Sequence, residues 1–149
     1  MIVPADISDG KTLTDIALIS KAFWGYSDAL IERWRKELTI TSNMIEEMTI
    51  YKFLQDGKAV GFYALNPPKK RTIELEMLFV LPDFIGIQIG KQLLHHSFEK
   101  GMELNCDSMT LLADPNALAF YESQGFYETN RKESSIPNRF LPILKVDLK

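Results

Sequence analysis

Cysteine is nearly absent from the sequence, since Cys106 is the only one among 149 residues. A single cysteine excludes an intramolecular disulfide and a thiolate metal site, and such a chain is typical of a reducing compartment. We therefore expect the protein in the cytoplasm. Because Cys106 follows a predicted helix end and has no histidine nearby in the sequence, we interpret it as a structural residue.

Metal-ligating patterns are also lacking. His95 and His96 are the two histidines of the chain, and adjacent residues point about 100° apart around a helix. They therefore cannot form the pair of ligands that an i, i+4 spacing provides. We expect both histidines at the surface and no bound metal.

Long apolar runs and a surplus of positive charge are missing as well. No apolar segment approaches the roughly 20 residues that cross a membrane, and residues 1–10 lack the features of an export signal. The formal net charge is −3, whereas nucleic-acid-binding domains usually carry a strongly basic face. We expect no membrane span, no export and no nucleic-acid partner.

The residues that are present suit one globular domain over 1–149, because 46% are hydrophobic and 25% are charged. Apolar residues recur at helical spacing in some segments and at strand spacing in others, and Asp56-Gly57 is a strong hairpin signal. In chain order, the predicted elements are a strand over 1–5, helices over 12–23 and 28–38, strands over 48–55, 58–65 and 72–80, a helix over 88–104, a strand over 108–113, a helix over 115–124, and strands over 127–131 and 139–148 separated by a polar loop through Pro137. This order favours an α/β domain with about four helices, in which the strands over 48–80 form an antiparallel meander.

The predicted strand over 72–80 carries two carboxylates. A period of two places Glu74 and Glu76 on one face and the apolar residues between them on the other. Because an unpaired buried carboxylate is costly, we expect one of the two to face a cleft. The alternative is a solvent-exposed face for both, which we favour for Glu74.

The loop over 82–91, between this strand and the next helix, is suited to bind an anion. A helix N-terminus leaves backbone N–H groups unpaired and carries a partial positive charge, and both features attract phosphate. Two common phosphate motifs are excluded. Gly90-Lys91 is followed by Gln92 rather than Ser or Thr, and Gly86 and Gly90 have the wrong spacing for a dinucleotide fingerprint.

Two segments of the sequence resemble the GNAT superfamily of acyl-CoA-dependent N-acyltransferases. Residues 75–82 and 89–94, on either side of the loop, are similar to the pyrophosphate-binding strand, loop and helix of that family. Residues 116–126, which contain Tyr121 and end in Gly125-Phe126, are similar to its downstream cofactor helix. The predicted order of elements also matches the family over almost the whole chain.

The resemblance implies a fold and a reaction. It implies a mixed, mostly antiparallel sheet flanked by helices. This sheet should be split by a V-shaped cofactor cleft where the strand over 72–80 parts from the strand over 108–113. The implied reaction transfers an acyl group, with acetyl as the expected one, from acetyl-CoA or another acyl-CoA to an amine by direct attack on the thioester.

Roles for individual residues follow from the resemblance. Glu76 stands where many members carry a carboxylate that removes the amine's proton, directly or through water. Tyr121 matches the acid that protonates the departing thiolate, and a core tyrosine is the alternative. A backbone N–H near residues 78–80 would stabilise the oxyanion, and Asn116 would bind the cofactor unless it is a helix cap. The residues expected to bind the cofactor are Leu78, Phe79, Val80, Gly86, Ile87, Gln88, Ile89, Gly90, Lys91, Asn116 and Tyr121.

The loop departs from the family pattern at two positions. Ile85 stands where Arg or Gln is usual, and Gln88 replaces the first glycine of the motif. Backbone N–H groups bind phosphate whatever the side chain, but Gln88 adds bulk and Lys91 is the only cation in the loop. We therefore expect weaker than usual CoA affinity. The departures also favour an alternative function, a non-catalytic acyl-CoA-binding or protein-interaction module.

The sequence indicates the chemical class of the acceptor. Trp24 and Tyr26 lie on a predicted connection between two helices, where an acceptor-facing role and simple packing are equal alternatives. Together with Glu74, Glu76 and Tyr63 near the cleft, these residues suggest a small-molecule or peptide amine that carries positive charge. A monomer and a homodimer are both compatible with the sequence.

Overall fold

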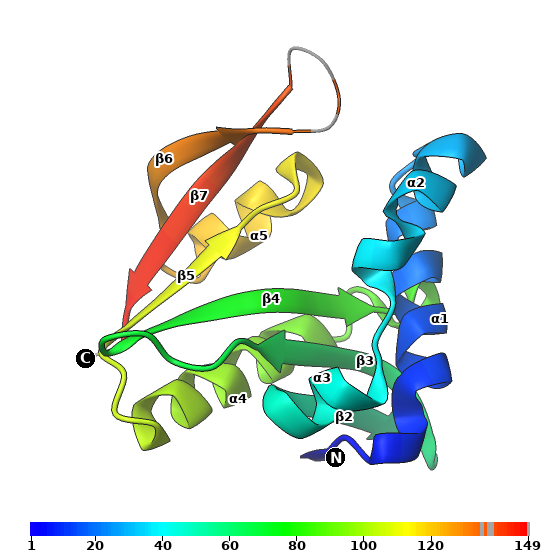
Figure 1. Ribbon diagram of the computed structural model, residues 1–149, viewed down its shortest axis with the longest axis horizontal. Helices are drawn as coiled ribbons and strands as arrows, with labels where there is room; N and C mark the ends of the chain where they lie inside the picture. The colour runs from blue at the N-terminus through cyan, green and yellow to red at the C-terminus, as the bar shows by residue number, and fades with distance from the viewer. Residues whose placement is uncertain (135, 137–138, 149) are drawn as a thin grey trace.

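A mixed sheet forms the centre of the computed structural model, which describes residues 1–134, 136 and 139–148 (Figure 1). Pro137 therefore lies outside the described residues. The strands are β1 (Ile2–Pro4), β2 (Thr49–Gln55), β3 (Lys58–Leu65), β4 (Thr72–Val80), β5 (Ser108–Leu112), β6 (Tyr127–Glu133) and β7 (Phe140–Asp147). Their order across the sheet is β1-β2-β3-β4-β5-β7-β6, and every neighbouring pair is antiparallel except β4 with β5. The predicted mixed, mostly antiparallel sheet is confirmed.

The parallel pair β4 and β5 splits the sheet. The two strands pair through Thr72–Glu74 and Ser108–Thr110, at the start of each strand. Beyond these residues β4 and β5 diverge, so that the sheet opens into a V (Figure 1). The split lies where the resemblance to the GNAT superfamily placed it.

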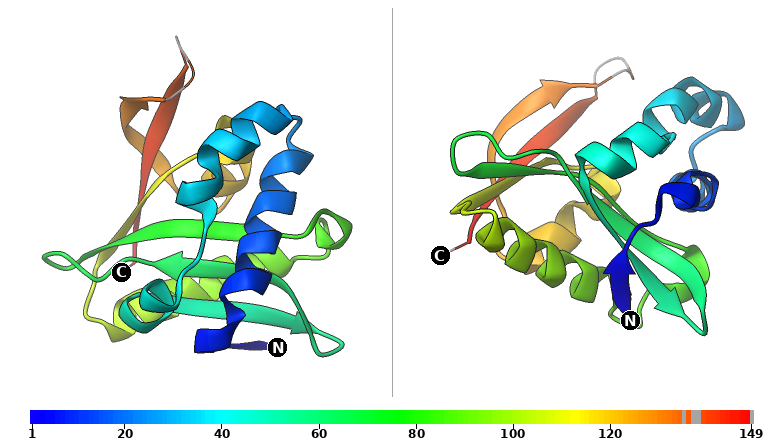
Figure 2. Two further views of the ribbon diagram at one scale, coloured as in Figure 1. Left: turned by 45° about the vertical axis from the view of Figure 1, so that its right-hand side comes forward. Right: turned by 60° about the horizontal axis from the view of Figure 1, so that its bottom comes forward.

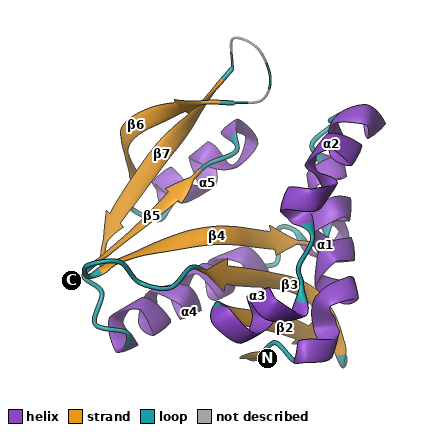
Figure 3. Ribbon diagram, in the orientation of Figure 1, coloured by secondary structure: helices purple, strands orange, loops and turns teal. Residues whose placement is uncertain are grey.

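Helices cover both faces of the sheet (Figure 3). The described α-helices are α1 (Gly10–Phe23), α2 (Asp28–Leu38), α3 (Ser42–Glu47), α4 (Ile89–Glu103) and α5 (Leu118–Ser123), with short 3-10 helices η1 (Ile7–Asp9), η2 (Pro82–Phe84) and η3 (Pro115–Ala117). The turned views show α4 on one side of the sheet and α1 with α2 on the other (Figure 2). None of these described helices has the length and apolarity that crossing a membrane requires.

Alternation along β3 divides the core between the two faces. Phe62 and Ala64 are buried among residues of α1, whereas Tyr63 and Leu65 are buried among residues of α4. The side chains of adjacent residues in a strand point to opposite faces of the sheet, so this division follows from the period of two. Tyr63, which we expected near the cleft, is instead completely buried on the α4 face.

Three details differ from the sequence expectations. Helix α3 was not predicted, because six residues capped by Thr41 are too short to show a helical period. The helix predicted over 115–124 is divided into η3 and α5, with Asp114 capping η3. His96 is half-buried rather than fully exposed: its Nδ1 lies 2.7 Å from the Tyr63 hydroxyl, and burial lowers its pKa.

Candidate active site

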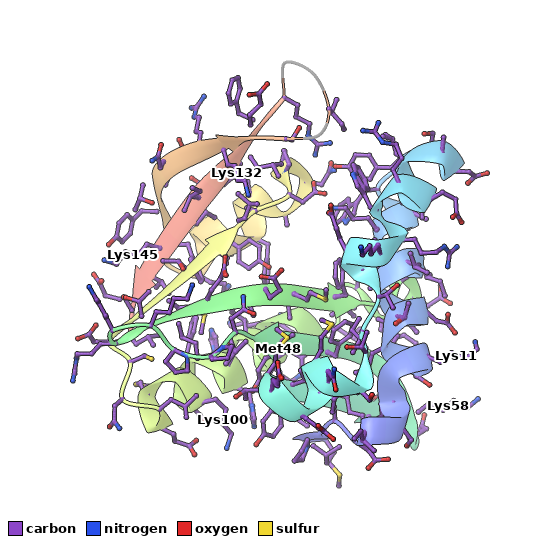
Figure 4. The ribbon with its side chains drawn as sticks, viewed as in Figure 1. Lys11, Met48, Lys58, Lys100, Lys132 and Lys145 are labelled. Carbon is purple, nitrogen blue, oxygen red and sulfur yellow. The ribbon has the colours of Figure 1, made fainter. Side chains whose placement is uncertain are left out.

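A cleft of about 960 Å³ lies between the diverging strands β4 and β5. Its walls also include residues of α1, α2, α4, α5 and the β6–β7 hairpin, from which Lys132 is labelled in Figure 4. The predicted site residues that line it are Trp24, Tyr26, Glu74, Glu76, Leu78, Phe79, Val80, Gly86, Gln88, Gly90, Lys91, Asn116 and Tyr121. Ile87 and Ile89 do not: Ile87 is half-exposed and Ile89 is buried. The fold thus brings together residues that are up to 97 positions apart in the sequence.

The turn before α4 presents backbone donors to one end of the cleft. Gly86 has a φ of +92° and Gln88 a φ of +71°, so both are left-handed. The first intrahelical bond of α4 is donated by Gln92 N–H to Gln88 C=O at 3.0 Å, and no side chain caps the helix. The N–H groups of residues 89–91 therefore have no acceptor within the helix and can bind an anion.

The side chains of this turn add little positive charge. Ile85 and Ile87 are 51% and 52% exposed, and Lys91 is the cation of the turn that lines the cleft. An anion bound here is therefore held by backbone N–H groups, the helix dipole and one ammonium group.

The free edge of β4 offers a second set of backbone groups. Leu81 N–H donates to Val60 C=O at 2.8 Å, so the peptide groups of alternate residues face β3. Those of Leu78 and Val80 face the opposite edge, where Val80 C=O accepts a hydrogen bond from the Ser20 hydroxyl at 3.0 Å. The N–H groups of Leu78 and Val80 therefore point toward the gap between β4 and β5.

Strand β4 carries two carboxylates, one at a β-bulge and one two residues before it. Ala64 pairs with Met77 and Leu65 pairs with Leu75, which leaves Glu76 as the extra residue of the bulge. Glu74 and Glu76 are both exposed and line the cleft. The sequence analysis favoured simple solvent exposure for Glu74, and its place in the cleft lining adds a second carboxylate beside Glu76.

Tyr121 is buried in α5 with its ring held by two aromatic neighbours. The ring centroids of Phe120 and Phe126 lie 5.3 and 5.4 Å away in edge-on arrangements. Among the described residues, no hydrogen bond to the Tyr121 hydroxyl is present and no buried side-chain oxygen is unpaired, so the hydroxyl opens into the cleft that Tyr121 lines. Burial raises the pKa of this phenol above its ordinary value, and the negative charge of Asp114 adds to the shift.

Five polar residues connect the two sides of the cleft. Asp114, before α5, accepts hydrogen bonds from Lys21 Nζ at 2.5 Å and from the Tyr26 hydroxyl at 2.9 Å, and it forms an ion pair with Arg139 at 3.4 Å. Tyr26 also accepts hydrogen bonds from Arg139 and, at 3.2 Å, from Asn116 Nδ2. We call these residues the Asp114 cluster.

The charges of the Asp114 cluster shift two pKa values. Burial alone would raise the pKa of Asp114, but the hydrogen bonds from Lys21 and from the Asn116 N–H hold it below its ordinary value. Burial raises the pKa of the Tyr26 phenol. Tyr26 and Asn116, expected to contact acceptor and cofactor, thus also bond to each other. No local signal in the sequence indicated that Lys21 and Arg139 join them, because these partners lie far apart along the chain.

Comparison with known proteins agrees with this geometry. A model described as the Acetyltransferase (GNAT) family matches residues 16–126. The chain belongs to the GNAT acetyltransferase family. The match includes the part of α1 from Ile16 onward, the turn before α4 and the helix of Tyr121.

Two curated relatives are similar in sequence to this GNAT protein. The peptidyl-lysine N-acetyltransferase YjaB of Salmonella typhimurium (strain LT2) is 27% identical over 135 residues, which cover 88% of this chain and 87% of that protein. The uncharacterized N-acetyltransferase ycf52 of Pyropia yezoensis is 24% identical over 90 residues, or 60% of this chain. That match covers 52% of the algal protein, so this chain spans about half of its length.

Solved structures show that the GNAT fold extends over the whole chain. The PaiA N-acetyltransferase of Thermoplasma acidophilum, in complex with coenzyme A, has a TM-score of 0.83 at 22% identity and covers 99% of this chain and 98% of that chain. An aminoglycoside 6′-N-acetyltransferase complexed with coenzyme A has a TM-score of 0.77 at 16% identity, with 100% and 97% covered. At these identities the likeness concerns the fold, and it confirms the fold class expected from the sequence.

Proposed function

We propose that this GNAT protein, as a single domain, transfers an acetyl group from acetyl-CoA to a primary amine. The observation that carries the proposal is one cleft that contains both Glu76 and Tyr121, together with the unpaired N–H groups before α4. A base, an acid and an anion-binding turn are the three requirements of acetyl transfer from a CoA thioester to an amine.

The cleft fits acetyl-CoA as a substrate. The N–H groups of residues 89–91 suit the pyrophosphate, which is a doubly charged anion. The peptide groups of Leu78 and Val80 point to the gap and suit the amides of the pantetheine arm. Asn116 lies on the opposite wall, where its side-chain amide can exchange the Tyr26 contact for one to the substrate.

The proposed mechanism is set by the protons and the negative charge that move during acetyl transfer. An alkylamine is mostly protonated at neutral pH, so Glu76 accepts one proton from the ammonium group before or during attack. The amine nitrogen then forms a bond to the thioester carbonyl carbon, and N–H groups of β4 stabilise the negative oxygen. When the carbon–sulfur bond breaks, Tyr121 donates its proton to the sulfur, and the second proton that the nitrogen must lose to become an amide restores the phenol of Tyr121.

Release of free CoA thiol tests the proposal. When native protein is mixed with acetyl-CoA and each amine of a panel, the rate of thiol release should rise with the concentration of one or more of these amines. Mass spectrometry should detect the acetylated amine. The alternative, a non-catalytic acyl-CoA-binding module, is favoured by Ile85 and by Gln88 in a left-handed conformation. Binding of acetyl-CoA without thiol release for any amine would support that alternative.

The acceptor is proposed to be cationic. Four carboxylates without a described ion pair, those of Glu37, Glu74, Glu76 and Glu133, line the cleft. Negative charge around a cleft concentrates cations and orients an ammonium group. The name of YjaB indicates action on peptidyl-lysine, whose side chain is such a cation. Small-molecule amines and lysine-containing peptides therefore form the panel.

The mutation Gln88→Gly is expected to tighten acetyl-CoA binding about fivefold. At a φ of +71° a residue with a Cβ is strained, and its side chain occupies space that a pyrophosphate needs. Glycine removes both obstacles and restores the residue that the family pattern has at this position. Isothermal titration calorimetry with acetyl-CoA measures the change.

Asn105→Gly is the matched control for this substitution. Asn105 also has a left-handed φ, +64°, but it follows the opposite end of α4 and does not line the cleft. It should leave acetyl-CoA affinity unchanged. Equal affinities for native protein and Gln88→Gly would show that Gln88 does not obstruct the cofactor.

A further inference from the structure

Asn66, the residue that follows β3, is bonded to both carboxylates of β4. Its backbone N–H donates to the Glu74 C=O at 3.0 Å. Its side-chain Nδ2 donates to Glu74 Oε1 at 2.8 Å and to Glu76 Oε2 at 2.9 Å. Both partners are acceptors, so the orientation of the amide is determined, and its two N–H protons are divided between two carboxylates.

The carboxylates of Glu74 and Glu76 face a common region of the cleft. Both accept hydrogen bonds from the single Nδ2 atom of Asn66, which holds the two side chains on the same side of β4 although the bulge lies at Glu76. Neither forms an ion pair within the described residues. Because the amide of Asn66 is neutral, its hydrogen bonds position both carboxylates without cancelling their charge.

We propose that Asn66 is a positioning residue that joins Glu74 and Glu76 into one site for the ammonium group of the acceptor. Its hydrogen bonds leave Glu74 Oε2 and Glu76 Oε1 free to accept from that group. Glu76 then takes one ammonium proton, which leaves the neutral amine that attacks the thioester. The inference rests on the proposed acetyl transfer to an amine, and it gives Glu74 a part in binding.

Asn66→Leu tests the role, because leucine preserves the volume and removes both donors. The acceptor KM should rise about tenfold, whereas kcat should change much less. The KM for acetyl-CoA should stay within about twofold. Asn43→Leu is the matched control, since Asn43 is exposed on α3 and does not line the cleft.

A second measurement is independent of turnover. Calorimetry with an amine that the thiol assay identifies as an acceptor, in the absence of acetyl-CoA, should show about tenfold weaker binding to Asn66→Leu than to native protein or Asn43→Leu. Unchanged amine binding together with an unchanged acceptor KM would overturn the inference even if the native protein acetylates amines. A native protein that acetylates no amine would instead overturn the proposed function, and the ammonium site with it.

Discussion

Replacing Tyr121 with phenylalanine is expected to lower kcat for acetyl transfer about 100-fold, while the Kd of acetyl-CoA stays within about twofold. Proton transfer by a positioned acid contributes about 10² to 10⁴ in rate. The edge-on contacts with Phe120 and Phe126 involve the ring, not the hydroxyl, so the variant should keep its fold. Steady-state thiol release and calorimetry with acetyl-CoA separate the two effects.

The raised pKa of Tyr121 gives this prediction a pH dependence. Because burial moves the pKa above the ordinary value, the phenol keeps its proton up to at least about pH 10. The native enzyme should therefore lose no activity through Tyr121 as the pH rises from 7 to about 10. A kcat that falls in step with phenol ionisation near pH 8 would contradict this environment for Tyr121.

Tyr127→Phe provides the control. Tyr127 lies exposed on β6 and is not part of the cleft lining, so the same loss of a hydroxyl should leave kcat unchanged. If Tyr121→Phe also retains kcat within about threefold, the buried aromatic ring is the whole contribution of Tyr121, and the acid is another group.

Much of the fold was predictable because its signals are local. Alternation between charged and apolar residues identified β4, and the helical spacing that follows the loop at 82–91 identified α4. The turn at Asp56-Gly57 identified the β2–β3 hairpin. The position of the split in the sheet came from the resemblance to a family, since periodicity alone does not say which strands pair.

The parts that were not predicted depend on contacts between distant segments or on backbone conformation. His96 was expected at the surface because its partners, Tyr51 and Tyr63, are on other elements. The left-handed conformation of Gln88 has no signature in a glutamine side chain, which rarely adopts it. The bond network of Asn66 depends on a bulge in the β3–β4 register, which a strand pattern does not reveal.

The Asp114 cluster joins residues that lie far apart in the sequence, so no local pattern predicted it. It leads to the second prediction of a large effect. The mutation Asp114→Ala is expected to lower the free energy of unfolding by about 3 kcal/mol, and the Tm by about 10 °C. It removes one negative charge and leaves Lys21 and Arg139, whose side chains are 20% and 22% exposed, without their counter-ion. It also removes the cap that accepts the Asn116 N–H. Urea unfolding followed by circular dichroism measures the loss.

Glu32→Ala is the matched control, because it also removes a carboxylate from an ion pair. The pair of Glu32 and Arg35 lies exposed within α2, where solvent screens it, so little change in stability is expected. An equal effect of the two substitutions would show that burial gives the Asp114 cluster no advantage over a surface pair.

The pH dependence distinguishes the charge of Asp114 from its role as a cap. The pKa of Asp114 is lower in the folded protein than in the unfolded chain, so its charge stabilises the fold above about pH 4. This contribution is lost as the pH falls through the folded pKa. The difference between native protein and Asp114→Ala should therefore be largest at neutral pH and should shrink below about pH 4. Because the cluster joins α1 to the segment before α5, the same variant should also loosen the cleft, and weaker acetyl-CoA binding at pH 7 would connect this stability to function.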